Sequence, residues 1–390
     1  MSAHYLLGVD IGTTGAKGVV FDRQGRQISS GYYEYPCTYP RPNWVEQDVD
    51  LIVSRSMDAV AHALELGGIG KDNIAAVSFS TQRCCTIFLD KAGTLIRPMI
   101  SWQDNRAVAE LDQIQEKISP EEFYQITSMP LNTTWMISKI LWLRNNEPDN
   151  WKRLAKIVQL QDYALKKWGA EGFLEDMSDA GFSGLWDPFA GDWSDELLNV
   201  FEIDKRFFSD VAASGEKAGA LSDDAAQRTG LKAGTPLIVG AGDQNSAAVG
   251  AGIVKKGYLS VSLGTGGLAA AFIDRPFRDP DCMTMVTNHA MKGKWQIEGL
   301  QAGAASVYKW FRDQFAAIEC AYADCSGKDV YEILNEMVEK APAGAKGLVM
   351  FPYLASATTP RWNPHARGLL AGLSFAHDKN CVARAFMEGI

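Results

Sequence analysis

The feature that most constrains this chain is a glycine- and threonine-containing turn between two apolar segments near its start. Residues 5–22 are predicted to form a hairpin of two strands, whose glycines let the backbone approach a ligand closely. Asp10 ends the first strand, and Thr13, Thr14 and Lys17 follow it. A carboxylate for Mg2+, exposed N–H groups and a cation together suit the phosphates of a nucleotide. A strand follows the turn, so this is not the G-x-x-x-x-G-K-S/T phosphate loop, which a helix follows.

The same pattern recurs in the second half of the chain. Residues 257–274 again read as strand, turn and strand, with Gly264, Thr265 and Gly266 in the turn. Leu263 stands near the position that the acid occupies in the first copy. One such segment alone is explained equally well as an ordinary hairpin. Two of them indicate two similar domains that face one nucleotide.

The length and composition are those of a globular protein with more than one core. A chain of 390 residues exceeds the usual limit for a single core, so two domains are expected. Hydrophobic residues make up 46% of the chain and charged residues 22%, which is ordinary for a soluble protein. The net charge of −9 argues against a surface that binds nucleic acid or anionic membranes.

The sequence shows no sign of secretion or of a membrane span. It has no apolar run long enough to cross a bilayer, and its N-terminus enters a strand without a signal peptide. The seven cysteines have no C-x-x-C spacing. We therefore expect free thiols in a reducing cytoplasm.

Polar side chains follow three predicted strands at their carboxyl ends. The strand 73–80 leads to Gln82 and Arg83, the short strand 98–102 leads to Asp104, and the strand 235–239 leads to Asp243 and Gln244. Ligands of α/β folds bind at such ends, so we expect Gln82, Arg83 and Asp104 to meet near one cleft. The alternative is that Arg83 and Asp104 form a surface ion pair.

Asp243 lies where a strand passes into a helix that is rich in small residues. The N–H groups at the start of that helix favour a charged carboxylate, which could accept a proton from a substrate hydroxyl. The same position also suits a simple helix N-cap. The residues alone leave these two interpretations equal.

Other segments give structural expectations only. Asp48 is predicted to cap a helix that runs through Leu66, and Asp378 to cap a helix that begins at Lys379. Residues 107–220 read as mostly helical, and their tryptophans at helical spacing are expected in the core: Trp135, Trp142, Trp151 and Trp168. The acidic segment 174–180 is expected to be a solvated turn.

Taken together, these segments resemble the FGGY family of carbohydrate kinases over nearly the whole chain. The matching blocks are DIGTTG at 10–15, WVEQD at 44–48, SWQDNR at 101–106, GDQ at 242–244 and SLGTG at 262–266. The resemblance implies an α/β fold of two actin-like, ribonuclease-H-like domains with the site in the cleft between them. It places an N-terminal sugar-binding domain at 1–245 and a C-terminal nucleotide-binding domain at 246–390.

The resemblance also implies an activity and roles for residues. The family transfers the γ-phosphate of Mg-ATP to a hydroxyl of a ketose or polyol. Asp243 is then the general base, and Asp10 helps to hold Mg2+. The remaining implied roles are substrate binding by Gln82, Arg83, Asp104, Asp243 and Gln244, and binding of the ATP phosphates by Thr13, Thr14, Lys17, Gly264, Thr265 and Gly266. A homodimer would fit the family.

Two departures from the family pattern bear on these expectations. Glycerol kinases follow the arginine with Glu, where this chain has Cys84, and they carry a tyrosine near Pro130 that is missing here. Segments 40–48 and 176–180 look more like xylulokinases, although these usually have Met-His in place of Gln82 and Arg83. We therefore expect a ketopentose such as xylulose, with glycerol or another polyol as the alternative.

The second departure concerns the C-terminus. Members of the family usually continue beyond the position of Ile390, with a Gly-Gly-Gly segment that holds adenosine. The expectation is therefore an incomplete second domain. A rival of another class is an actin-like ATP-driven switch, which would have no need of the Gln82, Arg83, Asp104 and Asp243 cluster. A sugar-binding remnant without activity is a third reading.

Overall fold

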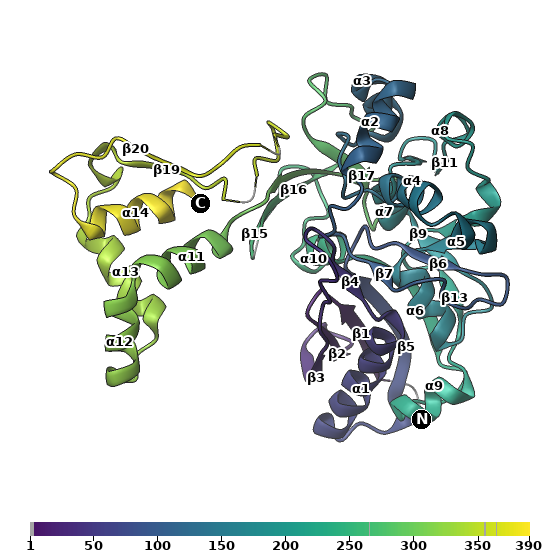
Figure 1. Cartoon of the computed structure of the whole chain (residues 1–390). Helices are drawn as coiled ribbons and strands as arrows, with labels where there is room; N and C mark the ends of the chain where they lie inside the picture. The colour runs from purple at the N-terminus through teal and green to yellow at the C-terminus, as the bar shows by residue number, and fades with distance from the viewer. Residues whose placement is uncertain (1–3, 265, 355, 364) are drawn as a thin grey trace. The chain divides into compact units, whose positions relative to one another are not determined.

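The structure, a computed structural model, describes residues 4–264, 266–354, 356–363 and 365–390 and divides into two units (Figure 1). Unit 1 holds the residues up to Tyr258 together with Phe272–Cys282 and Val286–Gln296. Unit 2 holds Leu259–Ala271, Met283–Met285 and Ile297–Ile390. Each unit has a hydrophobic core of its own.

A six-stranded mixed sheet forms the centre of unit 1, in the order β13-β14-β5-β1-β2-β3. The predicted hairpin is confirmed, because β1 and β2 pair antiparallel on either side of the glycine turn. Strands β5 and β14 run parallel to β1, so the three carboxyl ends meet at one edge. The strands are β1 (Tyr5–Ile11), β2 (Gly15–Asp22), β3 (Gln27–Glu34), β5 (Ile74–Thr81), β13 (Lys217–Ala220) and β14 (Pro236–Gly242).

One face of this sheet is covered by helices α1 (Val49–Gly67), α6 (Leu160–Trp168) and α9 (Asp223–Thr229). Alternation along β1 decides which face this is: Leu7 and Val9 are buried in the core, whereas Leu6 and Asp10 are exposed. Figure 1 shows α1 lying along β1–β3. Its N-cap is Asp48, whose side chain accepts from the N–H of Leu51, as predicted.

The region 107–220 is less helical than predicted, because short strands alternate with its helices. The helices are α2 (Val108–Lys117), α3 (Pro120–Thr127), α4 (Met136–Asn146), α5 (Pro148–Arg153), α7 (Met177–Ala180) and α8 (Asp195–Val200), besides α6. The strands are β8 (Lys156–Val158), β9 (Leu174–Asp176), β10 (Trp186–Asp187), β11 (Asp192–Trp193) and β12 (Asp210–Ala212). Trp135, Trp142 and Trp168 are buried as expected, and Trp151 is partly buried.

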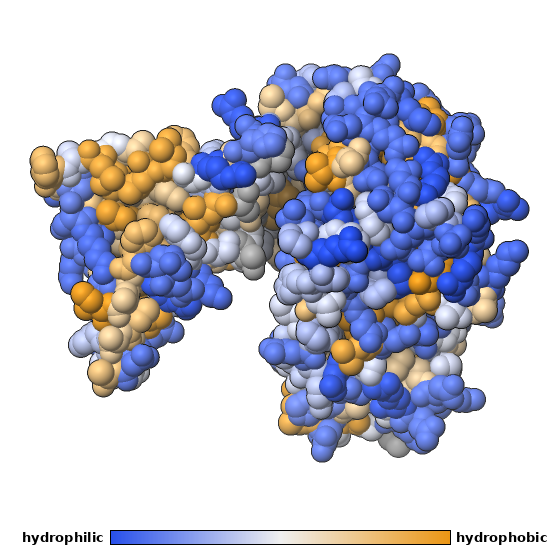
Figure 2. Space-filling model, viewed as in Figure 1, coloured by the Kyte–Doolittle hydropathy of each residue, from blue (hydrophilic) through white to orange (hydrophobic). Residues whose placement is uncertain are grey.

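Unit 2 contains the second hairpin, in which β15 (Leu259–Leu263) pairs antiparallel with β16 (Gly267–Ile273), so the predicted repeat is confirmed. Asp378 caps α14, as expected, and accepts from the N–H of Cys381. Figure 2 shows hydrophobic side chains on the visible face of unit 2. The exposed apolar residues of this unit include Leu369 and Phe375. Its other elements are β18 (Trp295–Gln301, shared with unit 1), α11 (Ala305–Phe315), α12 (Ala317–Ser326), α13 (Val330–Lys340), β19 (Val349–Phe351), β20 (Leu369–Ala371) and α14 (Lys379–Gly389).

Two further structural observations bear on the sequence predictions. All seven cysteines lie in the described part of the chain and are unpaired. Among the described residues, no helix combines the length and the apolar character that a bilayer crossing requires.

The prediction of a solvated turn at 174–180 is wrong. Glu175, Asp176 and Asp179 are all buried, in β9 and α7, and β9 is held by parallel pairing with β12. Polar partners make this burial possible: Asp176 accepts from the N–H groups of Ser178 and Asp179 and caps α7. The acidic composition suggested a surface loop, but a network of internal hydrogen bonds replaces water here.

A fourth buried acid, Asp162 of α6, belongs to the same cluster. It raises the pKa of Glu175 by charge repulsion, after the larger effect of burial. Burial raises the pKa of Asp162 to about 7, against hydrogen bonds from Ser209 and the backbone N–H of Tyr163. Burial also raises the pKa of Asp176 to about 6. The folded protein therefore binds protons here that the unfolded chain releases.

Close contact between α1 and β3 depends on Gly31. A Cβ atom at this position would lie 2.3 Å from the carbonyl oxygen of Ala59 and 2.8 Å from the backbone nitrogen of Ala63. Such distances require the helix to move away from the sheet. Gly8 of β1 is different, since a Cβ there would meet nothing closer than Phe21 at 3.6 Å.

Replacement of Gly31 by alanine should therefore destabilise unit 1. We expect Gly31→Ala to lower the free energy of unfolding by about 1–3 kcal/mol, because overpacking forces α1 and β3 apart. Gly8→Ala, in the same sheet, is the matched control and should leave stability unchanged or slightly raised. Thermal unfolding followed by circular dichroism measures both. Equal midpoints for the two variants would contradict the close contact at Gly31.

The buried acids predict how stability depends on pH. For Asp162 the folded pKa is raised, so its stabilising contribution is present below the ordinary value of 3.8 and is lost as pH rises to about 7. Asp162→Asn cannot lose a proton, so it should gain stability relative to the wild type over this pH window. Asp149→Asn, whose side chain is 93% exposed, is the control and should follow the wild type. Parallel stability curves for Asp162→Asn and the wild type would refute the raised pKa.

Candidate functional site

The carboxyl ends of β1, β5 and β14 bring the predicted phosphate and metal residues together in unit 1. The register places Asp10 opposite Ser80 of β5 and opposite Lys17 of β2. Ser80 donates a hydrogen bond from Oγ to Asp10 Oδ1 at 2.7 Å. Asp10 and Lys17 are both exposed, and paired residues of a hairpin project to the same face. A carboxylate, a hydroxyl and an ammonium therefore share one solvated position.

Arg83 and Asp243 form an ion pair at the same edge. Arg83 Nε lies 3.5 Å from Asp243 Oδ1, with 10% of the arginine side chain and 34% of the aspartate side chain exposed. Arg83 Nη1 donates to Asn245 Oδ1 at 3.1 Å, and the guanidinium lies 3.9 Å from the ring centroid of Phe182. The cation is thus fixed from three directions, while its partner carboxylate remains half-exposed.

Asp243 is not the N-cap of the helix that follows β14. The N-cap of α10 (Asp243–Gly250) is Gly242, so the N-cap alternative for Asp243 is wrong. Asp243 is the first helical residue, and its Oδ1 accepts from the N–H of Gln244 at 2.7 Å. The glycine is needed because a Cβ at 242 would lie 2.5 Å from Cδ of Arg83 and 2.6 Å from Oδ1 of Asp179. Because Gly242 has no side chain, Arg83 can cross the end of β14.

A chain of amide hydrogen bonds joins Gln82, another predicted substrate residue, to the first glycine turn. Gln82 Nε2 donates to Gln47 Oε1 at 3.0 Å, and Gln47 Nε2 donates to the carbonyl oxygen of Thr13 at 2.8 Å. Trp102 Nε1 donates to Thr13 Oγ1 at 3.0 Å. Both Gln82 and Gln47 are buried, and their hydrogen bonds fix the turn. Thr14, the next residue of the turn, is exposed.

Asp104 is an internal acid. Its carboxylate accepts from the N–H of Val45 at 2.6 Å and from Nε and Nη2 of Arg106 at 2.9 and 2.7 Å. Both side chains of this pair are fully buried. The surface ion pair with Arg83 is therefore not formed, and Asp104 holds the 43–48 loop that carries Gln47. A contact between Asp104 and a substrate stays a prediction.

The second glycine turn lies in unit 2. Gly264 donates from its N–H to the carbonyl oxygen of Gly266 at 2.9 Å, and its own carbonyl accepts from the N–H of Ala305 at 2.9 Å, at the start of α11. The turn therefore lies against the start of α11, although β16 follows it in the sequence. Thr265 lies outside the described residues.

Sequence reasoning missed the residues that hold Arg83. Asn245 follows Asp243 by two positions and is fully buried, with Nδ2 donating to the carbonyl oxygen of Asn288. Phe182 follows the acidic segment 174–180, whose burial the sequence did not predict. No local pattern marks either residue, because both act through contacts distant in the sequence.

Two sets of carboxylates have the chemistry of metal ligands. Asp10 is exposed and lies among oxygen donors, which suits a divalent cation bound together with phosphate oxygens. Glu175, Asp176 and Asp179 have ligand atoms within 4.8 Å of one another. These three are buried and already accept hydrogen bonds from protein groups. The exposed Asp10 therefore fits the metal better.

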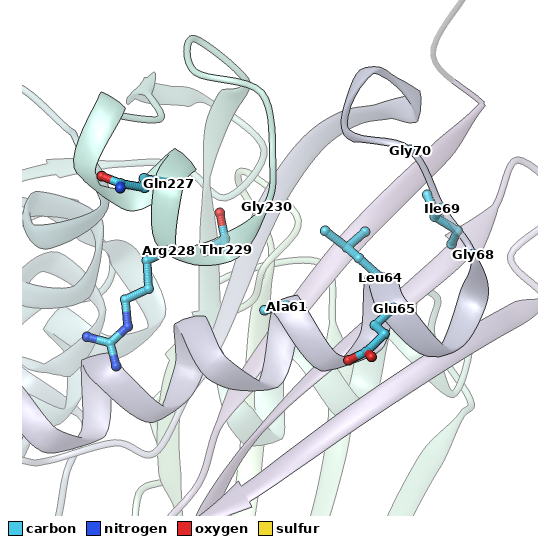
Figure 3. A pocket seen from close by; sticks show the side chains of 10 residues that line it. All are labelled: Ala61, Leu64, Glu65, Gly68, Ile69, Gly70, Gln227, Arg228, Thr229 and Gly230. Carbon is cyan, nitrogen blue, oxygen red and sulfur yellow. The ribbon is translucent and has the colours of Figure 1, made fainter.

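A surface groove of about 470 Å3 lies between the end of α1 and the end of α9 (Figure 3). Its lining runs from Ala61 to Gly70 and from Gln227 to Gly230, in the segments that precede β5 and β14. It is thus at the amino ends of these strands, whereas Arg83 and Asp243 lie beyond their carboxyl ends. The groove is separate from the site described above.

This chain is similar in sequence and structure to known sugar kinases. A gluconokinase from Bacillus subtilis (strain 168) is 30% identical over 99% of this chain and 74% of its own length. A xylulose kinase from Lactococcus lactis subsp. lactis (strain IL1403) is 28% identical over 99% of this chain and 74% of its own. The crystal structure of a ligand-bound xylulose kinase from Lactobacillus acidophilus matches with a TM-score of 0.90 and 26% identity, over 100% of this chain and 76% of that one.

The family comparison covers both halves of the chain. Residues 5–250 match the N-terminal domain of the FGGY family of carbohydrate kinases, and residues 259–390 match its C-terminal domain. The fold is therefore the two-domain, actin-like α/β fold that was expected. The chain belongs to the FGGY family of carbohydrate kinases and is a sugar kinase.

Proposed function

We propose that Asp243 is the general base in the transfer of the γ-phosphate of ATP to a hydroxyl of a small open-chain sugar, most favourably a ketopentose such as xylulose. The observation that carries this proposal is the half-exposed carboxylate of Asp243, held by the buried cation of Arg83 at the carboxyl end of β14. A charged, oriented and accessible oxygen is what a general base requires.

The reaction needs one proton transfer and one exchange of bonds at phosphorus. Asp243 accepts the proton of the sugar hydroxyl while that oxygen forms a bond to the γ-phosphorus. The bond from the γ-phosphorus to the bridging oxygen of ADP breaks, and ADP leaves with the electron pair. Phosphoryl transfer asks the protein chiefly for positioning and for neutralisation of charge.

The hairpin residues supply that neutralisation. Asp10 and Ser80 would hold Mg2+, which when bound offsets the negative charge of the phosphates. Lys17 adds a cation on the same face, and Thr13 and Thr14 lie in the turn beside it. We assign Gly264 and Gly266 of the second turn, which lies against the start of α11, to the ATP phosphates.

Gln82, Arg83 and Gln244 are our proposed sugar contacts. Cys84 is buried and offers no carboxylate where glycerol kinases carry Glu, so a substrate hydroxyl would lose an acceptor there. This disfavours glycerol. The likeness to xylulose kinases, at 28% identity in sequence and a TM-score of 0.90 in structure, supports the ketopentose.

A sugar acid is the second candidate. The guanidinium of Arg83 is a cation that could face a substrate carboxylate, and the gluconokinase from Bacillus subtilis is 30% identical to this chain. In that case Arg83 would bind the carboxylate, and the hydroxyl that reacts would have to lie close to it, beside Asp243.

A substrate panel separates these candidates. We expect ADP release with Mg-ATP to be fastest with xylulose among xylulose, ribulose, gluconate, glycerol and erythritol. The charge of the substrate is the reason for this expectation. A neutral ketose leaves the Arg83–Asp243 ion pair intact, whereas the carboxylate of gluconate competes with Asp243 for Arg83. A response to gluconate alone would transfer the assignment to the sugar acid. ATP hydrolysis that no sugar stimulates would support an actin-like switch instead.

Substitution of Asp243 tests the base. Asp243→Asn removes the proton acceptor while keeping the shape, so we expect kcat to fall by about 100- to 10,000-fold. Asp223→Asn is the matched control, because Asp223 is likewise the first residue of a helix, α9, and is exposed. Steady-state ADP release measures kcat, and circular dichroism checks the fold. Full activity of Asp243→Asn would exclude this residue as the base.

A further inference from the structure

The ammonium group of Lys139 is buried without a carboxylate partner. Lys139 lies in α4 and is 0% exposed, and no carboxylate of the described residues lies within salt-bridge distance of its Nζ. Its two acceptors are backbone carbonyl oxygens, those of Cys84 and Thr134, each at 2.9 Å. Burial lowers the pKa of Lys139. A buried cation is costly to keep, so its position calls for an explanation in terms of the groups that it joins.

The first of these carbonyls follows Arg83 directly. Cys84 has a φ of 62°, in the left-handed region that a residue with a side chain rarely adopts. Its N–H donates to Gln159 Oε1 at 3.1 Å, and its carbonyl accepts from Lys139. Gln159 is itself anchored, since its Nε2 donates to the carbonyl oxygen of Asp179. The turn after Arg83 is therefore held on both sides, in a conformation it would not adopt alone.

The second carbonyl belongs to the loop before α4. Thr134 donates from Oγ1 to Asn132 Oδ1 at 2.7 Å, and the neighbouring Thr133 donates to Asn105 Oδ1 at 2.6 Å. Asn105 adjoins the buried Asp104. Lys139 thus lies where three segments meet: the end of β5 with Arg83, the loop around Asp104, and the loop 132–135.

We propose that Lys139 is a positioning residue for the sugar site, which holds the left-handed turn at Cys84 so that Arg83 stays across Asp243. The ammonium acts through the backbone: it fixes the carbonyl of Cys84 against the loop of Thr134, and the arginine side chain that leaves this turn meets Asn245, Phe182 and Asp243. The proposal deepens the assigned function and rests on it, because Arg83 is there a sugar contact.

The test compares Lys139→Met with Lys156→Met. The control lysine also donates from Nζ to a backbone carbonyl, that of Phe208 at 2.8 Å, and it lies in β8 of the same unit. We expect Lys139→Met to raise KM for the sugar and lower kcat/KM by about 10- to 100-fold, since misplacement of a binding group has effects of this size. KM for ATP should stay unchanged. Lys156→Met should change none of these values.

A double-mutant cycle with Arg83→Lys shows whether the lysine acts through the arginine. If it does, Lys139→Met should cause little further loss once Arg83 has been replaced. Independent losses that multiply would overturn the proposal, as would equal effects of Lys139→Met and Lys156→Met. If Lys139→Met and Lys139→Gln both fail to fold, as judged by circular dichroism, the residue is structural only and the proposal is overturned.

Crystal structures of the variants separate this proposal from the function on which it rests. The Arg83 to Asp243 contact of 3.5 Å should be lost in Lys139→Met and kept in Lys156→Met. If the wild type releases no ADP with any sugar of the panel, the assigned function fails, but the crystal structures still decide whether Lys139 positions Arg83. An unmoved arginine in Lys139→Met would overturn the positioning role whatever the activity.

Discussion

The site of unit 1 depends on how the positive charge of Arg83 is compensated. Its guanidinium is almost fully buried, and a buried cation must be compensated on every side. Asp243 supplies the charge, Asn245 an oxygen and Phe182 an aromatic face. Gly242 leaves the space in which the side chain crosses the strand end. The carboxylate of Asp243 is thereby oriented, which suits the role of base that we propose for it.

The sequence alone predicted the parts of this structure that depend on local patterns. The two glycine hairpins, the cap at Asp48 and the strands that end near Asp10 and Arg83 all follow from short-range rules of turn chemistry and apolar alternation. The shared position of Asp10, Arg83 and Asp243 followed from a general property of parallel strands, whose carboxyl ends lie at one edge of the sheet.

What could not be predicted depends on contacts between distant segments. Acidic segments such as 174–180 are usually exposed, which is why the sequence predicted a solvated turn. In the structure these residues are buried, because partners from β12, α6 and β5 replace water. The burial of Asp104 also depends in part on a distant segment, since the N–H of Val45, 59 positions away, donates to its carboxylate. Lys139, in the middle of an ordinary helix, carries no local signal at all.

The hydrogen bonds from Gln82 through Gln47 to Thr13 have a consequence for how ligands communicate. They join the end of β5, where the sugar contacts are assigned, to the turn assigned to phosphate, through buried amides that have few other arrangements available. A ligand that restrains one of these segments thus restrains the other. Thermodynamic reciprocity then requires that whatever factor a bound sugar adds to nucleotide affinity, a bound nucleotide adds to sugar affinity. Order of addition therefore need not be enforced by a gate, since either ligand prepares the turn for the other.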